Sequence, residues 1–139
     1  MRLIRCALAV VVVGVGLLAQ TGCGEKSTSP VPLKTVTGTV TFNGSPLPQG
    51  TITFMPVAGS TSATGEIKDG KYTLSTFKPG DGAPAGDYKV AVQAWKAIPE
   101  MGQEGDPLIP KKYFGSNQST LTAKVTDQSP QTLDFTLQP

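Results

Sequence analysis

The side chains that most often carry out acid–base or metal chemistry are scarce in this chain of 139 residues. It contains no histidine, which excludes Ser-His and Cys-His nucleophile pairs, histidine metal ligands and imidazole acid–base catalysis. Its only thiols are Cys6 and Cys23, and it has no glycine-rich phosphate-binding loop. The residue types therefore favour a non-catalytic protein, and an enzyme of unknown type is kept as an alternative.

The main candidate binding surface is the aromatic and basic stretch that begins at Trp95 and continues through the patternless loop 97–112. Long loops carried on a rigid scaffold are common places for recognition. The candidate residues are Trp95, Lys96, Met101, Lys111, Lys112, Tyr113 and Phe114. The alternative is structural: Trp95 and Tyr113 pack the open end of the fold, and the prolines of the loop stiffen a crossover.

Acidic residues in the loops could in principle bind calcium, which needs six to eight converging oxygen ligands. They are Asp69, Asp81, Asp87, Glu100, Glu104 and Asp106. No D-x-D-x-D spacing occurs among them, and Asp69 and Asp81 stand beside glycines, as turn residues do. A pair of glycosidase carboxylates would also need a cleft. We therefore expect no metal ion and no cofactor.

The N-terminus has the pattern of an export signal. Arg2 and Arg5 precede the apolar stretch Ala7–Ala19, which is shorter than the roughly 20 residues of a bilayer-spanning helix. The segment that follows, Gln20-Thr21-Gly22-Cys23, resembles the lipobox of bacterial lipoproteins, although that family usually has Leu where Gln20 stands. Ordinary signal cleavage that leaves a free Cys23, or an uncleaved anchor, are the alternatives.

The lipobox resemblance implies a processing route and a location. Residues 1–22 would be removed as a lipoprotein signal peptide, and Cys23 would carry diacylglycerol on its thiol and a fatty acid, such as palmitate, on its amine. Residues 23–33 would then form a flexible tether rich in Ser, Thr and Pro. The expected location is the cell membrane or the outer membrane, facing the periplasm or the exterior.

The charge of the mature chain gives no reason to expect nucleic-acid binding. The full chain has 12 Lys and Arg against 10 Asp and Glu, but both arginines lie in the predicted signal. The remaining lysines and acidic residues are equal in number, and no basic run occurs. The membrane, through the lipid, is the expected partner, together with an envelope protein, a peptide or a glycan.

From residue 34 onward, apolar and polar residues alternate with a period of two, as in half-buried strands. The dipeptides Asn43-Gly44 and Asp69-Gly70 predict two-residue hairpin turns. The predicted strands are 35–42, 51–55, 65–68, 71–76, 87–95, 120–126 and 132–138. Pro46 and Pro48 are expected to interrupt pairing, and loop 78–86 is expected to be too rich in Gly and Pro to pair. Residues 34–139 are therefore predicted to form an all-β domain, a seven-stranded antiparallel sandwich.

Three segments of this domain resemble the carboxypeptidase regulatory-like domains, which have a transthyretin-like (prealbumin-like) fold. They are residues 36–46 (VTGTVTFNGSP), 69–74 (DGKYTL) and 84–90 (PAGDYKV). A further element, 109–113 (IPKKY), resembles one found in small bacterial lipoproteins that carry this domain. The resemblance implies a structural or binding module to which no catalytic residue belongs.

Two non-catalytic functions are consistent with these patterns. The first is a lipid-anchored cell-envelope module that displays a rigid surface or a strand edge to a protein, a peptide or a glycan. The second is a small-ligand binder or transport accessory that uses Trp95 and the loop 97–113.

Overall fold

The computed structural model describes residues 31–97, 100–102 and 104–139. The predicted signal peptide and the predicted lipidation site, Cys23, lie outside the described residues. Within them the chain is all-β, as predicted, with eleven strands and one short 3₁₀ helix, η1. The elements are β1 Leu33–Lys34, β2 Val36–Phe42, β3 Ser45–Pro46, β4 Gln49–Pro56, β5 Ala63–Lys68, β6 Lys71–Thr73, β7 Ala83–Pro84, β8 Gly86–Gln93, η1 Lys111–Tyr113, β9 Thr122–Val125, β10 Gln131–Thr132 and β11 Phe135–Leu137.

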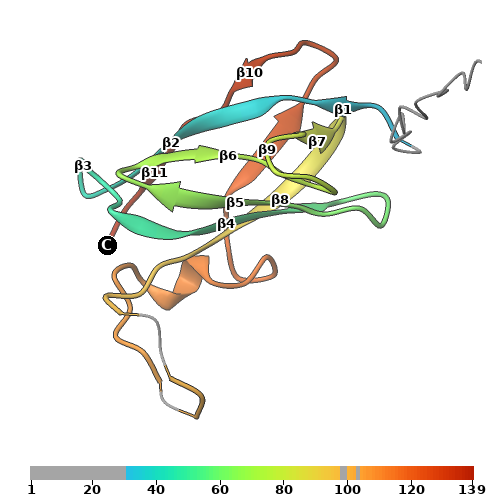
Figure 1. Cartoon of the computed structure of the whole chain (residues 1–139). Helices are drawn as coiled ribbons and strands as arrows, with labels where there is room; N and C mark the ends of the chain where they lie inside the picture. The colour runs from blue at the N-terminus through green and yellow to red at the C-terminus, as the bar shows by residue number, and fades with distance from the viewer. Residues whose placement is uncertain (1–30, 98–99, 103) are drawn as a thin grey trace, which may run out of the picture.

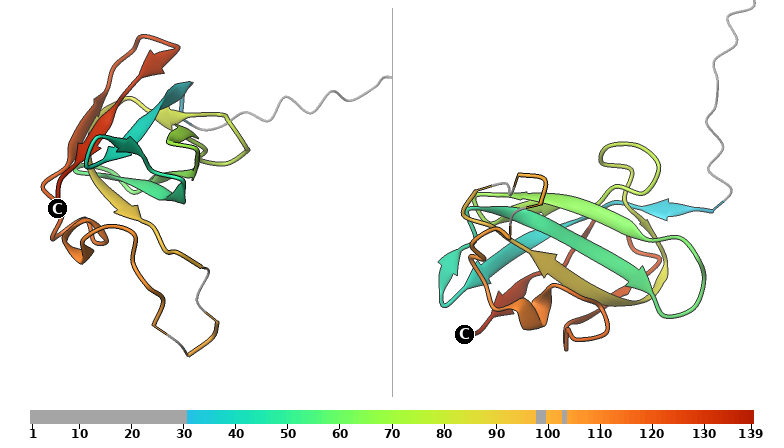
Figure 2. Two further views of the ribbon diagram at one scale, coloured as in Figure 1. Left: turned by 90° about the vertical axis from the view of Figure 1, so that its left-hand side faces the viewer. Right: turned by 90° about the horizontal axis from the view of Figure 1, so that it is seen from below.

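Nine of these strands form one sheet that curls around the core (Figures 1 and 2). Its order is β10-β2-β6-β5-β4-β8-β9, with β11 and β3 also paired to β2. The pair β1 and β7 forms a separate ribbon beside the start of β8. The end of the sheet where β1, β7 and the start of β8 lie is where the described chain enters, and β8 runs from there to the opposite end.

Both edge strands of the curled sheet are linked by one side chain. The Gln131 amide nitrogen donates to the Lys124 carbonyl of β9 at 2.9 Å, and its oxygen accepts from the Thr126 N–H at 2.9 Å. Gln131 itself begins β10, which pairs with β2 on the far edge of the sheet. A short turn and one glutamine thus bring the two edges together.

Each of the seven predicted strands overlaps an observed strand, but the last prediction is wrong in two respects. Residues 132–138 do not form one continuous strand, because β10 and β11 are separated by Leu133 and Asp134. Both strands also run parallel to β2, not antiparallel. Strand direction could not be read from alternation, which is the same in the two arrangements.

The interruption between β10 and β11 is held by side chains of the neighbouring strands. The Leu133 carbonyl accepts from the Tyr72 hydroxyl at 2.6 Å. The Asp134 carboxylate accepts from the Thr39 N–H at 2.8 Å and from its hydroxyl at 2.9 Å. Opposite Leu133 on β2 stands Gly38, whose missing side chain leaves room for that carbonyl. The C-terminal segment is therefore fastened to β2 where the ladder is broken.

Both predicted hairpin turns are confirmed. Asn43 and Gly44 have φ of 50° and 79°, and Asp69 and Gly70 have φ of 50° and 78°. Positive φ at both central residues is the requirement of a type I′ turn, which Asn-Gly and Asp-Gly meet at low cost.

The expectation that proline-rich segments would not pair is wrong at two places. Pro46 lies in β3, which pairs with β2, and Pro84 lies in β7, which pairs with β1. Each of these strands has only two residues. Proline can end a strand or lie on its free edge, where no ladder bond needs its missing N–H. The first strand, β1, also takes up Leu33, which the sequence assigns to the tether.

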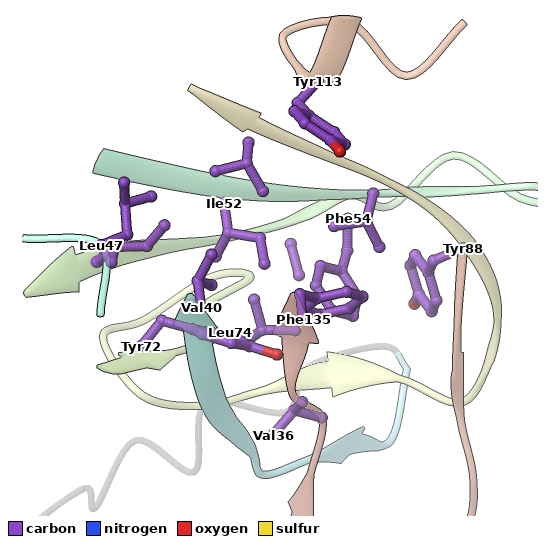
Figure 3. Packing of buried hydrophobic residues seen from close by; sticks show 14 of the residues in the cluster. Val36, Val40, Leu47, Ile52, Phe54, Tyr72, Leu74, Tyr88, Tyr113 and Phe135 are labelled. Atoms are coloured by element: carbon purple, nitrogen blue, oxygen red, sulfur yellow. The ribbon is translucent and has the colours of Figure 1, made fainter. Parts of the chain in front are cut away.

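The core is a single cluster centred on Phe54 (Figure 3). The Phe54 ring lies 6.3 Å from Tyr72, 5.7 Å from Tyr88 and 5.9 Å from Phe135, measured between ring centroids. These four rings come from β4, β6, β8 and β11, so the cluster connects both sides of the curl. The core also takes in apolar residues that alternation did not predict: Leu47, Ala63, Ala83 and Ile109.

Candidate functional site

The candidate binding surface lies at the end of β8, away from the point where the described chain enters (Figure 1). Beyond Gln93 the chain leaves the sheet in a long excursion, closed at its base by two backbone hydrogen bonds. The Lys96 N–H donates to the Asp106 carbonyl at 2.9 Å, and the Leu108 N–H donates to the Ala94 carbonyl at 2.9 Å. The base of the excursion is therefore fixed to the sheet.

Trp95 stands at this base and is held on two sides. Its ring meets that of Phe114 edge-on, with 4.8 Å between centroids and 61° between planes. Its backbone carbonyl accepts from the Gln49 side-chain amide at 2.6 Å, and that amide also donates to the Lys96 carbonyl at 3.1 Å. The indole is only partly buried, so part of it faces solvent in a defined position.

Tyr113 belongs to the core and offers no surface to a ligand. It is 6% exposed and points from η1 towards the cluster (Figure 3). Its hydroxyl donates to the Gln138 carbonyl at 3.1 Å and accepts from the Gln138 N–H at 3.0 Å. Beside it, the Lys112 ammonium donates to the Pro139 carbonyl at 2.8 Å and lies 5.2 Å from the Tyr113 ring centre. These two residues fasten the C-terminus, as the packing alternative expects for Tyr113.

The other predicted contact residues of the excursion are dispersed. Lys96 lies 3.6 Å from the Asp106 carboxylate, and Lys111 pairs with Glu104. The hydrogen bond and the charge of Lys111 hold the pKa of Glu104 below its ordinary value. Met101 is fully exposed at the far side of the excursion. The structure thus brings Trp95 and Phe114 together, and it does not gather the lysines and Met101 around them.

A hollow of about 560 Å³ lies next to Trp95, on the outer face of the sheet. Strands β5, β4 and β8 form its floor. Its polar side chains are those of Gln49, Thr51, Glu66, Lys68, Asp69 and Gln93. Asp69 is one of the acidic loop residues considered for calcium. The sequence did not single out the other five, although each is the polar member of an alternating pair. Only the pairing of the three strands shows that they share one face.

The acidic loop residues have structural partners or stand apart. The Asp81 carboxylate accepts from the N–H groups of Thr76, Phe77 and Lys78 at 2.6, 2.9 and 2.8 Å. Desolvation raises the pKa of Asp81, but these backbone hydrogen bonds outweigh it and lower the pKa overall. In residues 31–97, 100–102 and 104–139, no three Cys, Asp or Glu side chains gather closely enough to hold a metal ion.

Comparisons with known proteins add no family to these observations. No protein-family model, curated protein or solved structure matches the chain. In the part of the chain that the structure describes, no helix has the length and apolarity needed to cross a bilayer.

Proposed function

We propose that this protein is a non-catalytic, lipid-anchored module of the cell envelope, exported by residues 1–22 and tethered through Cys23. Its domain would be a transthyretin-like sandwich of the carboxypeptidase regulatory-like kind. The three segments that carry this resemblance include both type I′ turns, Asn43-Gly44 and Asp69-Gly70, and the start of β8.

The observation that carries the proposal is that three of the four exposed large apolar side chains in the described residues lie at one end of the sheet, while the fourth, Met101, lies in the excursion at the other end. Met55, Val57 and Phe77 are 43, 65 and 52% exposed. Met55 and Val57 lie at the end of β4, opposite the start of β8, because Met55 pairs with Lys89 and the Val57 N–H donates to the Asp87 carbonyl. All of these positions are at the end where the described chain enters.

Phe77 reaches the same end from another element. It lies in the loop that Asp81 organises, and the Gly82 of that loop packs against the Lys34 backbone of β1. The loops after β4 and β6 therefore flank the entry point, as Figure 2 shows. Exposed apolar side chains that gather at one place commonly mark a contact surface. A bilayer next to the tether would cover them.

The length of the proposed tether is consistent with this orientation. Eight peptide units separate Cys23 from Val31, the first described residue, and they reach at most about 28 Å when fully extended. The domain would thus stay close to the membrane surface. Trp95 and the excursion, at the opposite end of the sheet, would face away from it.

The outward end of the domain is proposed to interact through a surface, because the edge strand β9 pairs only with Gly86–Lys89 of β8 and does not reach that end. A peptide that added to β9 would need its free backbone groups. At the entry end, the Gln131 side chain already bonds the Lys124 carbonyl of β9 and the N–H of Thr126, the residue after this strand. A rigid surface around Trp95 is then the better candidate for contact with an envelope protein, a peptide or a glycan.

The test is to express the full chain with its own N-terminus in a bacterial host supplied with labelled palmitate. We expect label in the membrane fraction, loss of label and release from the membrane for Cys23→Ser, and full labelling for the matched control Cys6→Ser. A Cys23→Ser protein that is cleaved yet stays membrane-bound would contradict lipid anchoring. Since Gln20 departs from the lipobox, Gln20→Leu is expected to increase the processed fraction.

A further inference from the structure

The floor of the hollow beside Trp95 is a regular polar surface set by the strand register. Thr51 of β4 pairs with Glu66 of β5 on one side and with Gln93 of β8 on the other. Two residues earlier on β4, Gln49 pairs with Lys68 and lies next to Trp95, just beyond the end of β8. At ordinary strand and residue spacings, this floor measures about 10 by 7 Å.

The polar groups of the floor are held in place before any ligand arrives. The Gln49 amide nitrogen donates to the carbonyls of Trp95 and Lys96, and the Gln93 amide nitrogen donates to the Phe114 carbonyl at 3.1 Å. Because each nitrogen is already bonded to the protein, the orientation of both amides is set. Neither amide oxygen accepts a hydrogen bond from the described residues, so each can accept one from a ligand hydroxyl.

The charged side chains of the hollow are one lysine and two carboxylates, with a net charge of −1. The Lys68 ammonium lies 3.1 Å from the Glu66 carboxylate, and Asp69 is the only other charged residue in the lining. Such a site has no concentrated field that would select a phosphate or a polycation. Its chemistry suits a neutral ligand that has many hydroxyl groups.

Trp95 supplies the apolar part of the site. A partly exposed indole at the side of a polar floor can cover the C–H face of a sugar ring, while hydroxyl groups bond the amides, threonine and carboxylate below. The volume of about 560 Å³ lies within the usual range for small-ligand sites, roughly 300–1,000 Å³. The floor is large enough for one or two pyranose rings.

From this arrangement we infer that the hollow bounded by Trp95, Gln49, Thr51, Glu66 and Gln93 binds a neutral saccharide. This inference deepens the proposed function, since it selects a glycan from the partners considered for the outward end. In the proposed orientation the hollow would face away from the membrane, where a glycan of the envelope could reach it.

The experiment is a titration of the full-length chain, purified in a non-ionic detergent without a sugar headgroup, and followed by the fluorescence of Trp95, its single tryptophan. The probes are oligosaccharides of N-acetylglucosamine, of β-linked glucose and of α-linked glucose. We expect saturable quenching by at least one series. Inorganic phosphate and a neutral hexapeptide serve as comparison ligands and are expected to give none.

Two matched substitutions locate the binding. Thr51→Val removes a hydroxyl from the floor, whereas Thr64→Val removes one from an exposed position of β5 outside the hollow. Since both keep the β-branched shape, neither is expected to disturb folding. Thr51→Val should weaken saccharide binding about 3- to 10-fold, the value of one hydrogen bond, and Thr64→Val should not change it.

The inference is overturned if no saccharide quenches saturably, if phosphate or the peptide binds instead, or if both threonine variants behave alike. The titration is repeated on the Cys23→Ser chain, because saccharide binding does not need the lipid. Loss of binding with normal palmitate labelling would reject the saccharide site alone. Binding without labelling would reject the anchor and leave the site in place.

Discussion

Substitution of Gly38 by alanine tests how the C-terminal segment is fastened to β2. Glycine inside a strand normally costs roughly 0.5–1 kcal/mol relative to alanine, so an ordinary strand would be stabilised by this change. Here a Cβ atom would overlap the Leu133 carbonyl oxygen and lie 2.7 Å from its carbonyl carbon and 2.9 Å from the Tyr72 ring. The Leu133 backbone must therefore move away.

The magnitude follows from two terms. Forcing an extra carbon into a filled space costs about 1–3 kcal/mol, and disturbing the hydrogen bond from Tyr72 to the Leu133 carbonyl costs about 1 kcal/mol more. We expect Gly38→Ala to lower the free energy of unfolding by about 3 kcal/mol. For a domain of this size, that corresponds to a fall in Tm of about 10–15 °C.

The assay is thermal unfolding of the full chain, followed by far-ultraviolet circular dichroism. The matched control is Gly115→Ala, since an added Cβ there meets nothing within 4 Å and the backbone is not in the left-handed region. This control should leave Tm within a few degrees of the wild-type value. A Gly38→Ala protein as stable as the control, or more stable than wild type, would refute the close approach of Leu133 to β2.

Three further predictions follow from the loops, the core and the exposed apolar side chains. Asp81→Ala should destabilise the domain by about 1 kcal/mol at neutral pH. Because hydrogen bonding lowers the pKa of Asp81 in the folded state, the difference in stability between the variant and the wild type should shrink as the pH falls below about 4. Denaturation curves recorded at acidic pH would test this. Burial, and to a lesser extent the charge of Asp134, raises the pKa of Tyr72 in the folded state. Above about pH 10 this tyrosine therefore ionises more readily in the unfolded chain, and the stability of the wild type should fall. Tyr72→Phe should reduce this loss of stability at alkaline pH. If the variant loses as much stability as the wild type between neutral and alkaline pH, Tyr72 is not its source. Val57→Ser and Phe77→Ser, made in the lipid-anchored chain, should leave the free energy of unfolding within about 0.5 kcal/mol but make the chain easier to extract from the membrane fraction with dilute detergent. Unchanged extraction would show that the tether end does not touch the bilayer.

Local rules account for the parts of the fold that could be predicted. Alternation with a period of two located every long strand, because a strand that is half buried must place its apolar residues on one face. The turns at Asn43-Gly44 and Asp69-Gly70 were predictable because few residue pairs tolerate positive φ twice in succession. These are properties of a few neighbouring residues, and they need no knowledge of the rest of the chain.

The predictions that failed concern residues whose burial depends on contacts with segments distant in sequence. Leu47 lies in a proline-rich stretch without alternation, yet it is buried because its N–H donates to the Val40 carbonyl and its carbonyl accepts from the Gly70 N–H. Tyr113, predicted as a possible ligand contact, is buried because the C-terminus lies against it. Neither position could be recognised from its neighbours along the chain.

Composition and short-range pattern were enough to establish an all-β domain without histidine chemistry, and they singled out Trp95. The polar floor beside Trp95 could not be found in the same way, since Glu66, Thr51 and Gln93 are far apart in sequence and become neighbours through the pairing of β5, β4 and β8. The parallel attachment of β10 and β11 also depended on contacts across about 95 residues. Such pairings depend on the packing of the whole domain, which no local preference encodes.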